Sequence, residues 1–493
     1  MTSPSRHFLL AALAVTAWLT GCASTAGLGP RDAPRDANGL ASSQTLGAVS
    51  TPAAWPATDW WTSLDDPQLD ALVLEALAGS PSLEVAAART RQALSAAGAA
   101  DAARGPRIDG TAASTRERFS RNGLVPPPLG GSTHTVNDLR ATLGWEIDFW
   151  GGRRAAFDAA LGAARAAEVD EYAARLALST NVARAYVEFQ HAYRQHDVAV
   201  ATLAERERIF ALTHDRYAAG LDSRLELKQA ESALPATREE IVRFDERMTL
   251  ARNEIAALLG QGPDRGRALA RPALHAVATP AVPSTVPAEL LGRRPDVVAQ
   301  RWRVEAAARD IAAAKAQFYP NVNLVAFVGL QSLGVSHLLT AASGTFGAGP
   351  AVTLPIFDTG RLRASLAGRD ADYDAAAAQY NATLAAALRD VVDQLASLRS
   401  IDAQRIEQAR AAAALRDAYD LALLRYREGL GNYLQVLSAE QPLLTQQALD
   451  VDLQARQLDL TIGLVRALGG RRPHGTQRLR RGESVLVARR AAR

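Results

Sequence analysis

The sequence has little of what disulfide-stabilised or β-rich proteins contain. Its 493 residues include one cysteine, Cys22, so no disulfide can form within the chain. Aromatic residues make up 6% of the sequence and β-branched residues are sparse outside a few short stretches, whereas Ala and Leu dominate. Since Ala and Leu favour helices, most of the chain is predicted to be helical, and its 48% apolar content is enough for a large core.

Residue sets for catalysis or metal binding are also missing. The sequence has no Gly-x-Ser-x-Gly motif and no cysteine besides Cys22. His191 and His196 are five positions apart on a predicted helix, so their side chains point about 140° apart and do not suit one metal. The segment Gly347–Pro350 leads into a predicted strand, so it is not a phosphate-binding loop before a helix. We therefore expect no enzyme, no metal and no other cofactor.

The positive charge is confined to the C-terminal end. The formal net charge is +3, but the 24 residues from Gly470 to Arg493 contain eight Arg and one acid, Glu483. The remainder is slightly acidic and has no basic face interleaved with aromatic residues, which argues against a nucleic-acid partner. Residues 470–493 are predicted to be a basic, disordered tail.

The N-terminal segment carries a targeting pattern. Arg6 precedes the apolar run Phe8–Leu19, which is too short to span a bilayer, and the run ends in Leu19-Thr20-Gly21-Cys22. This ending resembles the bacterial lipobox, whose cysteine is diacylated and becomes the mature N-terminus; an ordinary buried cysteine is the alternative. The resemblance implies a signal peptide at residues 1–21 and durable lipid anchorage at Cys22. Ala23, in place of Asp, implies the outer membrane.

The strongest pattern is an internal repeat. Pro81 and Pro106 recur as Pro295 and Pro320, 214 residues later, and from Gly151 onward the offset is 209 residues. The difference of five residues is placed in a hairpin loop, where changes of length are tolerated. The predicted organisation is an acylated flexible tether at 22–57, a first repeat at 58–260, a linker at 261–284 and a second repeat at 285–469.

Each repeat contains two stretches in which helical periodicity gives way to alternation. In the second repeat, the apolar residues Val322, Leu324, Ala326 and Val328 occupy every second position, which places them on one face of a strand. Loops rich in Gly and Pro separate the two stretches, which indicates a β-hairpin in each repeat. The four predicted strands are about 107–119, 135–147, 321–331 and 345–356.

Each repeat also contains a long helical hairpin. The stretches 155–218 and 361–428 have no internal proline, and at 1.5 Å per residue each continuous helix would be roughly 100 Å long. Both end in a similar heptapeptide, Arg216–Asp222 and Arg425–Gly431, whose glycine suits a left-handed turn at a helix end. Apolar and small residues at 4,3 spacing predict coiled-coil packing of these helices.

The number of strands predicts an oligomer. Four strands cannot close on themselves, because the smallest single-chain membrane barrels have eight. An open sheet edge in lipid would leave backbone groups without hydrogen bonds, so several chains must pool their strands.

Several motifs, in order along the chain, resemble those of one family. Leu290–Val297, Ala306–Pro320, Leu354–Phe357 with Gly360, and Arg425–Leu430 are similar to the TolC-like outer-membrane efflux channels, in their lipoprotein (NodT-like) branch. The resemblance implies a mainly α fold with a small β-barrel part: a homotrimer with a twelve-stranded outer-membrane barrel on a periplasmic helical tunnel. It also implies two partners, a periplasmic adaptor and an inner-membrane pump, often of the resistance-nodulation-division type. Such a channel is a passive exit duct for drugs or other small amphiphiles.

In that family the two helical-hairpin turns form the periplasmic tip, where the adaptor docks. The resemblance therefore implies a docking tip made of Arg216, Tyr217, Gly220, Leu221, Arg425, Tyr426, Gly429 and Leu430. The alternative is structural: the glycines only end helices, and the tyrosine rings pack on the partner helix.

The resemblance also implies a pore constriction beside these turns. Family members often have an Asp just after the second turn, where a ring of carboxylates selects cations. The matching residues here are Gln435 and Ser438, neither of which is acidic. Asp222 and Glu226, after the first turn, or the deeper Glu440, could supply the ring instead, unless they are ordinary solvated helix charges.

Two other functions remain open at this point. A type I protein-secretion channel shares the fold and differs in its partners, and the lipobox disfavours it. A coiled-coil scaffold lipoprotein without a pore is the other, and the alternating stretches at 321–331 and 345–356 favour a channel over it.

Overall fold

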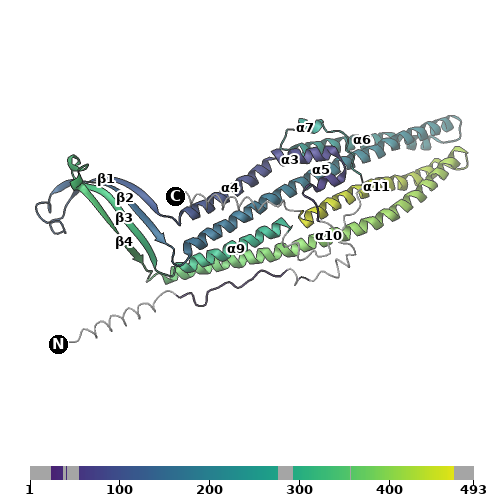
Figure 1. Cartoon of the computed structure of the whole chain (residues 1–493). Coiled ribbons are helices and arrows are strands. Elements are labelled where there is room, and N and C mark those ends of the chain that lie inside the picture. The colour runs from purple at the N-terminus through teal and green to yellow at the C-terminus, as the bar shows by residue number, and fades with distance from the viewer. Residues whose placement is uncertain (1–23, 37–39, 41–54, 276–292, 356, 471–493) are drawn as a thin grey trace. The chain divides into compact units, whose positions relative to one another are not determined.

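The computed structural model describes residues 24–36, 40, 55–275, 293–355 and 357–470, most of them helical (Figure 1). Cys22 and the basic tail lie outside the described residues. The elements, in chain order, are η2 (Trp60–Leu64), α3 (Pro67–Gly79), α4 (Pro81–Ala102), β1 (Arg107–Arg118), β2 (Thr133–Ile147), α5 (Gly152–Ala218), α6 (Arg224–Leu258), α7 (Pro263–Arg267), α9 (Pro295–Ala316), β3 (Asn321–Leu333), η3 (Val335–His337), η4 (Ala341–Ser343), β4 (Gly344–Thr353), α10 (Thr359–Arg427) and α11 (Tyr433–Leu468).

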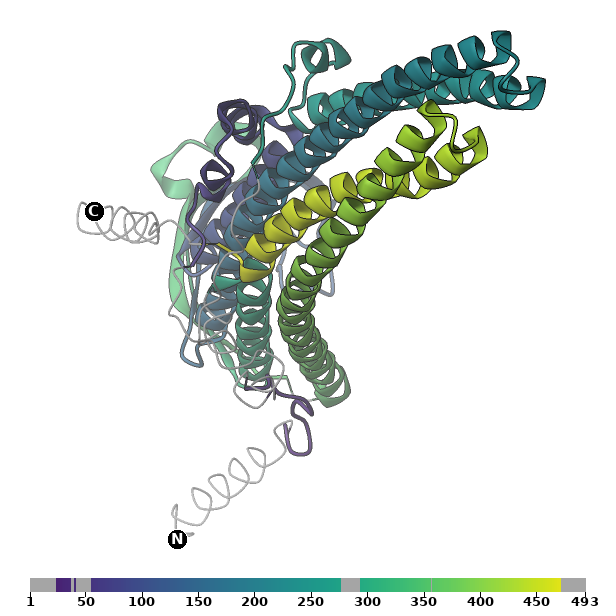
Figure 2. The same ribbon diagram turned by 90° about the vertical axis from the view of Figure 1, so that its right-hand side faces the viewer.

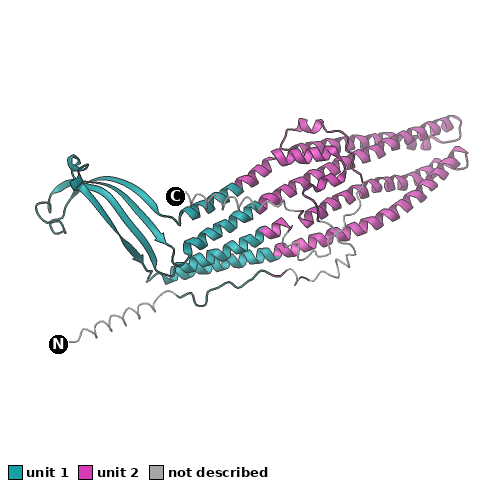
Figure 3. Ribbon diagram, in the orientation of Figure 1, with its two compact units in different colours: residues 1–34, 89–168, 299–381 teal, residues 35–88, 169–298, 382–493 magenta. Residues whose placement is uncertain are grey.

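The chain divides into two compact units, coloured separately in Figure 3. The first contains residues 1–34, 89–168 and 299–381, and the second contains residues 35–88, 169–298 and 382–493. The sheet belongs to the first unit, and both helical-hairpin turns belong to the second. The predicted class is confirmed: the fold is mainly helical with a small sheet, and the hairpins occur in tandem.

The sheet of the first unit has four antiparallel strands in the order β1-β2-β3-β4. Two hairpins, β1–β2 and β3–β4, are joined by a pairing of β2 with β3 that runs from Val136↔Leu333 to Ile147↔Val322. The connection at 119–132 is longer than the one at 334–343, in agreement with the offset between the repeats. β4 ends at Thr353, earlier than the predicted residue 356, because Leu354 and Pro355 do not pair with β3.

The register gives this sheet one mainly apolar and one mainly polar face. Side chains alternate along a strand, and cross-strand partners share a face. The first face carries apolar side chains along most of its length: Ile108, Ala112, Leu139, Ala141, Leu143, Trp145, Ile147, Val322, Leu324, Ala326, Val328, Leu330, Phe346 and Val352. Polar residues occupy this face only toward the β1–β2 loop end: Ser114, Arg116, Arg118, Thr135, Asn137 and Ser332. The second face is mostly polar, with Asp109, Thr111, Asp138, Arg140, Thr142, Glu146, Asn321, Asn323, Gln331, Thr345 and Thr353, and it also carries Val136, Val325, Phe327 and Leu333. Large apolar side chains on the first face are exposed, Phe346 by 85% and Ile108 by 70%.

Residues 24–33 lie along α10, although their composition predicted a tether that packs on nothing. The guanidinium of Arg363 donates to the carbonyl oxygens of Ser24 and Ala26, and Asn381 Nδ2 donates to the carbonyl of Ala33 at 3.1 Å. The carboxylate of Asp374 accepts hydrogen bonds from two backbone N–H groups, of residues 31 and 32, at 2.8 and 2.9 Å. We call residues 24–33 the strap. The prediction of a flexible tether at 22–57 did not include these contacts, in which polar side chains of α10 bond the backbone of the strap.

The second unit is held together by apolar side chains at helical spacing. In α3, Leu69, Leu72, Val73 and Ala76 are buried and pack on α5. Asp66 caps this helix by accepting from the backbone N–H groups of residues 68 and 69, and Pro67 occupies the first helical position, where no N–H is needed. In α10, four of the five apolar residues at the predicted 4,3 spacing, Leu384, Val391, Leu395 and Leu398, are buried, and the fifth, Leu388, is half-buried.

No single helix among the described residues is both long and apolar enough to cross a bilayer. The pair α3 and α4 meets the criterion only when taken together, and it is bent by 41°.

Candidate functional site: the paired hairpin tips

Both helical hairpins turn at the same end of the second unit, where they lie side by side (Figure 2). Gly220 and Gly429 have φ angles of +74° and +73°, in the left-handed region. In the first turn the N–H of Leu221 donates to the carbonyl of Arg216 at 2.9 Å; in the second the N–H of Leu430 donates to that of Arg425 at 2.8 Å. This is the Schellman arrangement, which favours glycine at the left-handed position. We call residues 213–226 and 423–438 the hairpin tips.

The helix that follows each turn has its own cap. Ser223 begins α6 with a capping box, in which Glu226 accepts a hydrogen bond from the Ser223 backbone N–H at 2.9 Å. The hydrogen bond from the Ser223 side chain is the main reason that the pKa of Glu226 is lowered. Asn432 begins α11 by accepting from the backbone N–H of Gln435 at 3.1 Å. Both tips are therefore closed turns whose backbone groups are satisfied locally.

A buried polar cluster joins the two tips. Arg216 reaches Asp222 through Nε at 3.1 Å and donates through Nη1 to the carbonyl of Tyr426 at 3.0 Å. The Tyr426 hydroxyl donates to Asp222 and lies 2.9 Å from Thr213 Oγ1. The Arg216 guanidinium also lies over the Tyr426 ring, 4.6 Å from its centre. We call Arg216, Asp222, Tyr426 and Thr213 the tip cluster.

The tip cluster is shielded from solvent. Tyr426 is fully buried, and the side chains of Arg216 and Asp222 are 12% and 6% exposed. Burial, followed by the hydrogen bond to Asp222, raises the pKa of Tyr426 to about 12, so its hydroxyl stays protonated and donates. Arg216 and Tyr426 were expected to contact a partner, but in this chain they connect one hairpin to the other.

A second buried contact lies deeper between the hairpins. Arg206 on α5 bonds Glu440 on α11 at 3.0 Å, with exposures of 13% and 7%, and donates to Thr237 Oγ1 on α6 at 2.8 Å. Glu440 is therefore a partner of Arg206 and not a solvated charge. Sequence reasoning missed Arg206; the available signal was its place among apolar positions of α5.

The remaining tip residues present an apolar surface. Leu221 and Leu430, which follow the two glycines, are 66% and 70% exposed. Tyr217 is 41% exposed, and Leu225 and Leu434 on the following helices are 64% and 57% exposed. Four exposed leucines and one partly exposed tyrosine at and beside two short turns are unusual on a free surface and are typical of an interaction site.

The four residues predicted at a constriction have different environments. Asp222 belongs to the tip cluster, and Glu226 to the capping box of α6. Gln435 and Ser438 are exposed on the first turns of α11, where the Ser438 hydroxyl donates to the carbonyl of Leu434 at 2.7 Å. The second hairpin therefore presents uncharged polar groups at these positions.

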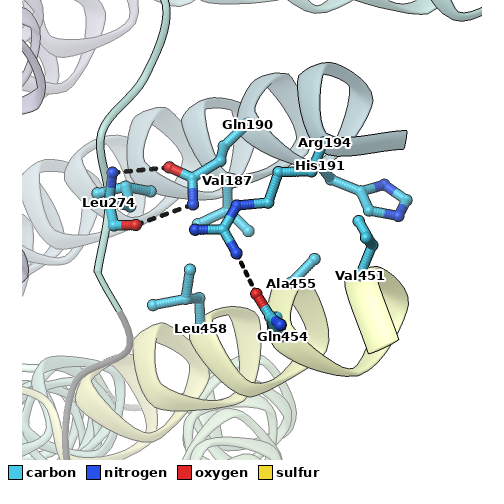
Figure 4. Close-up of a pocket in the computed structure, with 9 residues that line it drawn as sticks. All are labelled: Val187, Gln190, His191, Arg194, Leu274, Val451, Gln454, Ala455 and Leu458. Atoms are coloured by element: carbon cyan, nitrogen blue, oxygen red, sulfur yellow. Dashed lines mark hydrogen bonds between the residues drawn. The ribbon is translucent and has the colours of Figure 1, made fainter. Parts of the chain in front are cut away.

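Further from the tips, polar side chains connect α5 to α11 (Figure 4). His191 Nε2 lies 2.7 Å from Asp452 and its Nδ1 lies 3.5 Å from Glu188, whose hydrogen bond is the main reason that the pKa of His191 is raised. Beside it, Gln190 bonds the backbone of Leu274 and Arg194 bonds Gln454, around a cavity of about 20 Å³. This volume holds no more than one water, so the cavity is not a ligand site.

The two histidines considered for a metal have separate partners. His196 faces Asp245 on α6 at 3.6 Å, whereas His191 faces α11. In the described ranges no group of three or more His, Cys, Asp or Glu residues is arranged to bind a metal ion.

A sheet with one mainly apolar and one mainly polar face, continued by two long helical hairpins, is the architecture of an outer-membrane channel protein. The profile of the family described as "outer membrane efflux protein" matches residues 72–261 and 286–470. The chain therefore belongs to the outer membrane efflux protein family, and the resemblance found in the sequence is confirmed.

Individual relatives agree with this assignment. The chain is 42% identical over 379 residues to the fusaric acid resistance protein FusA of Burkholderia cepacia, covering 75% of this chain and 71% of that one. It is 33% identical over 430 residues to the multidrug resistance outer membrane protein MdtP of Escherichia coli K12, covering 85% and 87%. Among solved structures, the outer membrane protein VceC of Vibrio cholerae matches with a TM-score of 0.80 and 37% identity, covering 84% of this chain and 99% of that one.

Proposed function

We propose that the protein is the outer-membrane exit duct of a three-part efflux system, passing drugs or other small amphiphilic molecules without catalysis. The observation that carries this proposal is the two-faced sheet. Its apolar face suits lipid, and its polar face suits a water-filled lumen. The names of FusA and MdtP, which refer to fusaric acid resistance and multidrug resistance, support this class of substrate.

We further propose that three chains form one barrel. β1 and β4 are the edges of the sheet, and neither has an outer partner among the described residues. Pairing β4 of one chain with β1 of the next would satisfy both edges, and three sheets of four strands would close a ring of twelve. The helices would then continue into the periplasm, and Cys22 would carry the lipid anchor in the outer membrane.

The strap supports this placement of the anchor. Ser24 is bound by Arg363, close to the start of α10 at Thr359, and β4 ends at Thr353. A lipid on Cys22, two residues before Ser24, would lie near the junction of strands and helices, where the membrane surface is expected.

We propose that the hairpin tips dock the periplasmic adaptor, which connects the channel to an inner-membrane pump of the resistance-nodulation-division type. Leu221 and Leu430 supply the exposed contact surface, and the turns at Gly220 and Gly429 give it its shape. Arg216 and Tyr426 support this surface from inside. The Arg425 guanidinium, which lies 3.4 Å from the carbonyl of Leu430, stays at the surface of the second turn.

For the constriction we propose an uncharged polar ring from Gln435 and Ser438, with Glu226 as the acid that the first hairpin could contribute. A ring of Asp222 carboxylates is disfavoured, because that carboxylate is 6% exposed and paired with Arg216.

Two measurements test the proposal. Purified protein should give trimers on chemical crosslinking and ion conductance in a planar bilayer; a monomer without conductance would indicate a scaffold lipoprotein.

A charged loop inserted at Gly429 should abolish drug export in cells while leaving the trimer and its conductance intact. Undiminished resistance in that variant would count against the tips as the docking site.

A further inference from the structure

A second cavity, far larger than the one beside His191, lies in the helical unit. Its volume is about 510 Å³, within the range of small-molecule sites. It is bounded by α5, α10, α11 and the beginning of α9. We call it the alcove.

The alcove has both apolar and charged lining. From α5 it is lined by Ala173, Ala174, Leu176 and Ala177, all half-buried, and by Arg184. The other elements contribute Arg294, Arg466, Asp296, Asp390 and Gln394, together with Pro295, Gly463 and Ala467. A cavity with apolar and charged side chains suits a ligand that has both an apolar body and a charged group.

Most charges in the alcove are already paired. Arg294 is 11% exposed and bonds Asp296 at 2.9 Å and Asp390 at 2.7 Å, so one guanidinium is shared by two carboxylates, and Asp390 is also bonded by Arg389 at 3.2 Å. The pKa of Asp390 is lowered despite its burial, mainly by the bond from Arg294, in keeping with a carboxylate that stays ionised. Arg184 is paired with Asp459 at 2.9 Å.

Arg466 is the exception. It lines the alcove from the last turns of α11 and is exposed, and it has no ion pair within the part of the chain that the structure describes. Its guanidinium is therefore available to a ligand, although Arg184, Arg294 and Arg466 together balance Asp296, Asp390 and Asp459, so that these six groups carry no net charge. A guanidinium offers five N–H donors in a planar fork, which suits a carboxylate or sulfonate.

The first repeat provides an internal comparison. With the offsets of 214 and 209 residues, Arg294 corresponds to Ser80, Gln394 to Ala185 and Arg466 to Ala257. Small residues occupy these positions in a copy of the same fold, and Ala256 and Leu259 beside Ala257 are buried. The helices of the first repeat therefore pack without large polar side chains at these three positions, so packing does not explain why the second repeat has Arg294, Gln394 and Arg466 there.

We propose that the alcove binds an amphiphilic organic anion, with its carboxylate or sulfonate on Arg466 and its apolar body against Ala173, Ala174 and Ala177 of α5. The proposal rests on the proposed function in one respect: we expect the ligand to be one of the molecules that the channel exports. Binding itself depends only on the second unit.

Equilibrium dialysis of the purified full-length protein in detergent tests the proposal, with 2-naphthalenesulfonate as the anionic probe and micelles alone as the reference. Saturable binding is expected, and Arg466→Gln should weaken it about tenfold or more, since a hydrogen bond to a charged group contributes about 1.5–3 kcal/mol. Arg466→Lys should retain part of the affinity. A cationic probe, 2-naphthylmethylammonium, should bind more weakly than the sulfonate.

A second variant tests the cavity rather than the charge. Gly463 packs so closely that an added Cβ would lie 2.7 Å from Gln394 Oε1 and 3.1 Å from Arg184 Nη2. Gly463→Ala should therefore displace these side chains into the alcove and reduce binding while Arg466 remains. Arg456→Gln is the matched control, because Arg456 is also an exposed arginine of α11 but does not line the alcove.

The outcomes separate this proposal from the proposed function. Absence of saturable binding, or an equal loss with Arg456→Gln, would overturn the alcove as an anion site. Conductance of the same preparation reports on the channel independently. A protein that conducts but does not bind the sulfonate would refute the anion site in the alcove and leave the exit duct supported. A protein that binds it without conducting supports the alcove and refutes the exit duct.

Discussion

Removing the carboxylate of Asp222 should open the hairpin tips. In Asp222→Ala, Arg216 would keep its contact with the Tyr426 carbonyl but lose both charge-assisted bonds to the carboxylate, of 3.1 and 3.3 Å. Because the two side chains are only 12% and 6% exposed, water does not replace the lost partner. Breaking such a pair from one side costs about 3–5 kcal/mol, so local opening should increase roughly a hundredfold or more.

Hydrogen exchange measures this directly, at backbone amides that close the turns. The N–H groups of Leu221 and Leu430 are bonded within their own tips, and both should exchange faster in Asp222→Ala. Glu231→Ala is the control: the Lys228–Glu231 pair is shorter, at 2.6 Å, but its side chains are 56% and 51% exposed. Its loss should cost less than about 0.5 kcal/mol.

A double variant separates the charge from the shape of the cluster. Arg216→Met combined with Asp222→Leu removes both charges, and it should exchange more slowly than Asp222→Ala, because no unpaired ion remains buried. If Asp222→Ala has no larger effect than Glu231→Ala, the tip cluster does not hold the hairpins together and the reasoning fails.

Four further predictions concern other parts of the chain. The pKa of His191 is raised in the folded protein, mainly by the hydrogen bond with Glu188 and also by that with Asp452, so the stabilisation from these contacts is complete below pH about 6.5 and is lost as pH rises through the folded pKa; hydrogen exchange of α5 should show this loss, and His191→Gln should abolish the pH dependence. Cys22→Ser should take up no radiolabelled fatty acid, and persistent labelling would refute the anchor. Asp374→Ala removes the acceptor of two strap N–H groups and should make residues 24–33 accessible to proteases, which unchanged digestion would contradict. Gln435→Asp should introduce a carboxylate ring and raise the cation selectivity of the conductance, and unchanged selectivity would move the constriction away from this residue.

The sequence predicted the elements well where local chemistry determines them. Gly220 and Gly429 sit at positive φ because each ends a helix, a requirement that can be read from the residue type. The four strands followed from alternation, and β4 fell short only where Pro355 interrupts the pattern. The internal repeat supported the predictions of the turns and of the strands. Alternation is weak in β1, which could be predicted as a strand because it corresponds to β3 in the second repeat.

Burial across the hairpins could not be predicted in the same way. Asp222 and Glu440 were open to interpretation as solvated or pore-lining charges, yet each is paired with an arginine from α5. The partners are separated by six residues in one case and by 234 in the other, so a spacing rule could suggest only the first. The strap was missed because it offers few apolar side chains: its contacts are made mostly by backbone groups, with Leu28 packed on the cluster that contains Leu362 and Leu366.

The two copies of the turn motif differ in a way that bears on assembly. Tyr426 is fully buried against the first hairpin, but its counterpart Tyr217 is 41% exposed. In the proposed closed ring each first hairpin would also meet a second hairpin of the neighbouring chain, and the exposed Tyr217 would be available for that contact. The counterpart of Asp222 in the second copy is Gly431, so that contact would have no carboxylate for the tyrosine and arginine to bond. The interface between chains at the tips should therefore be weaker than the contact within each chain, and the ring would open there first.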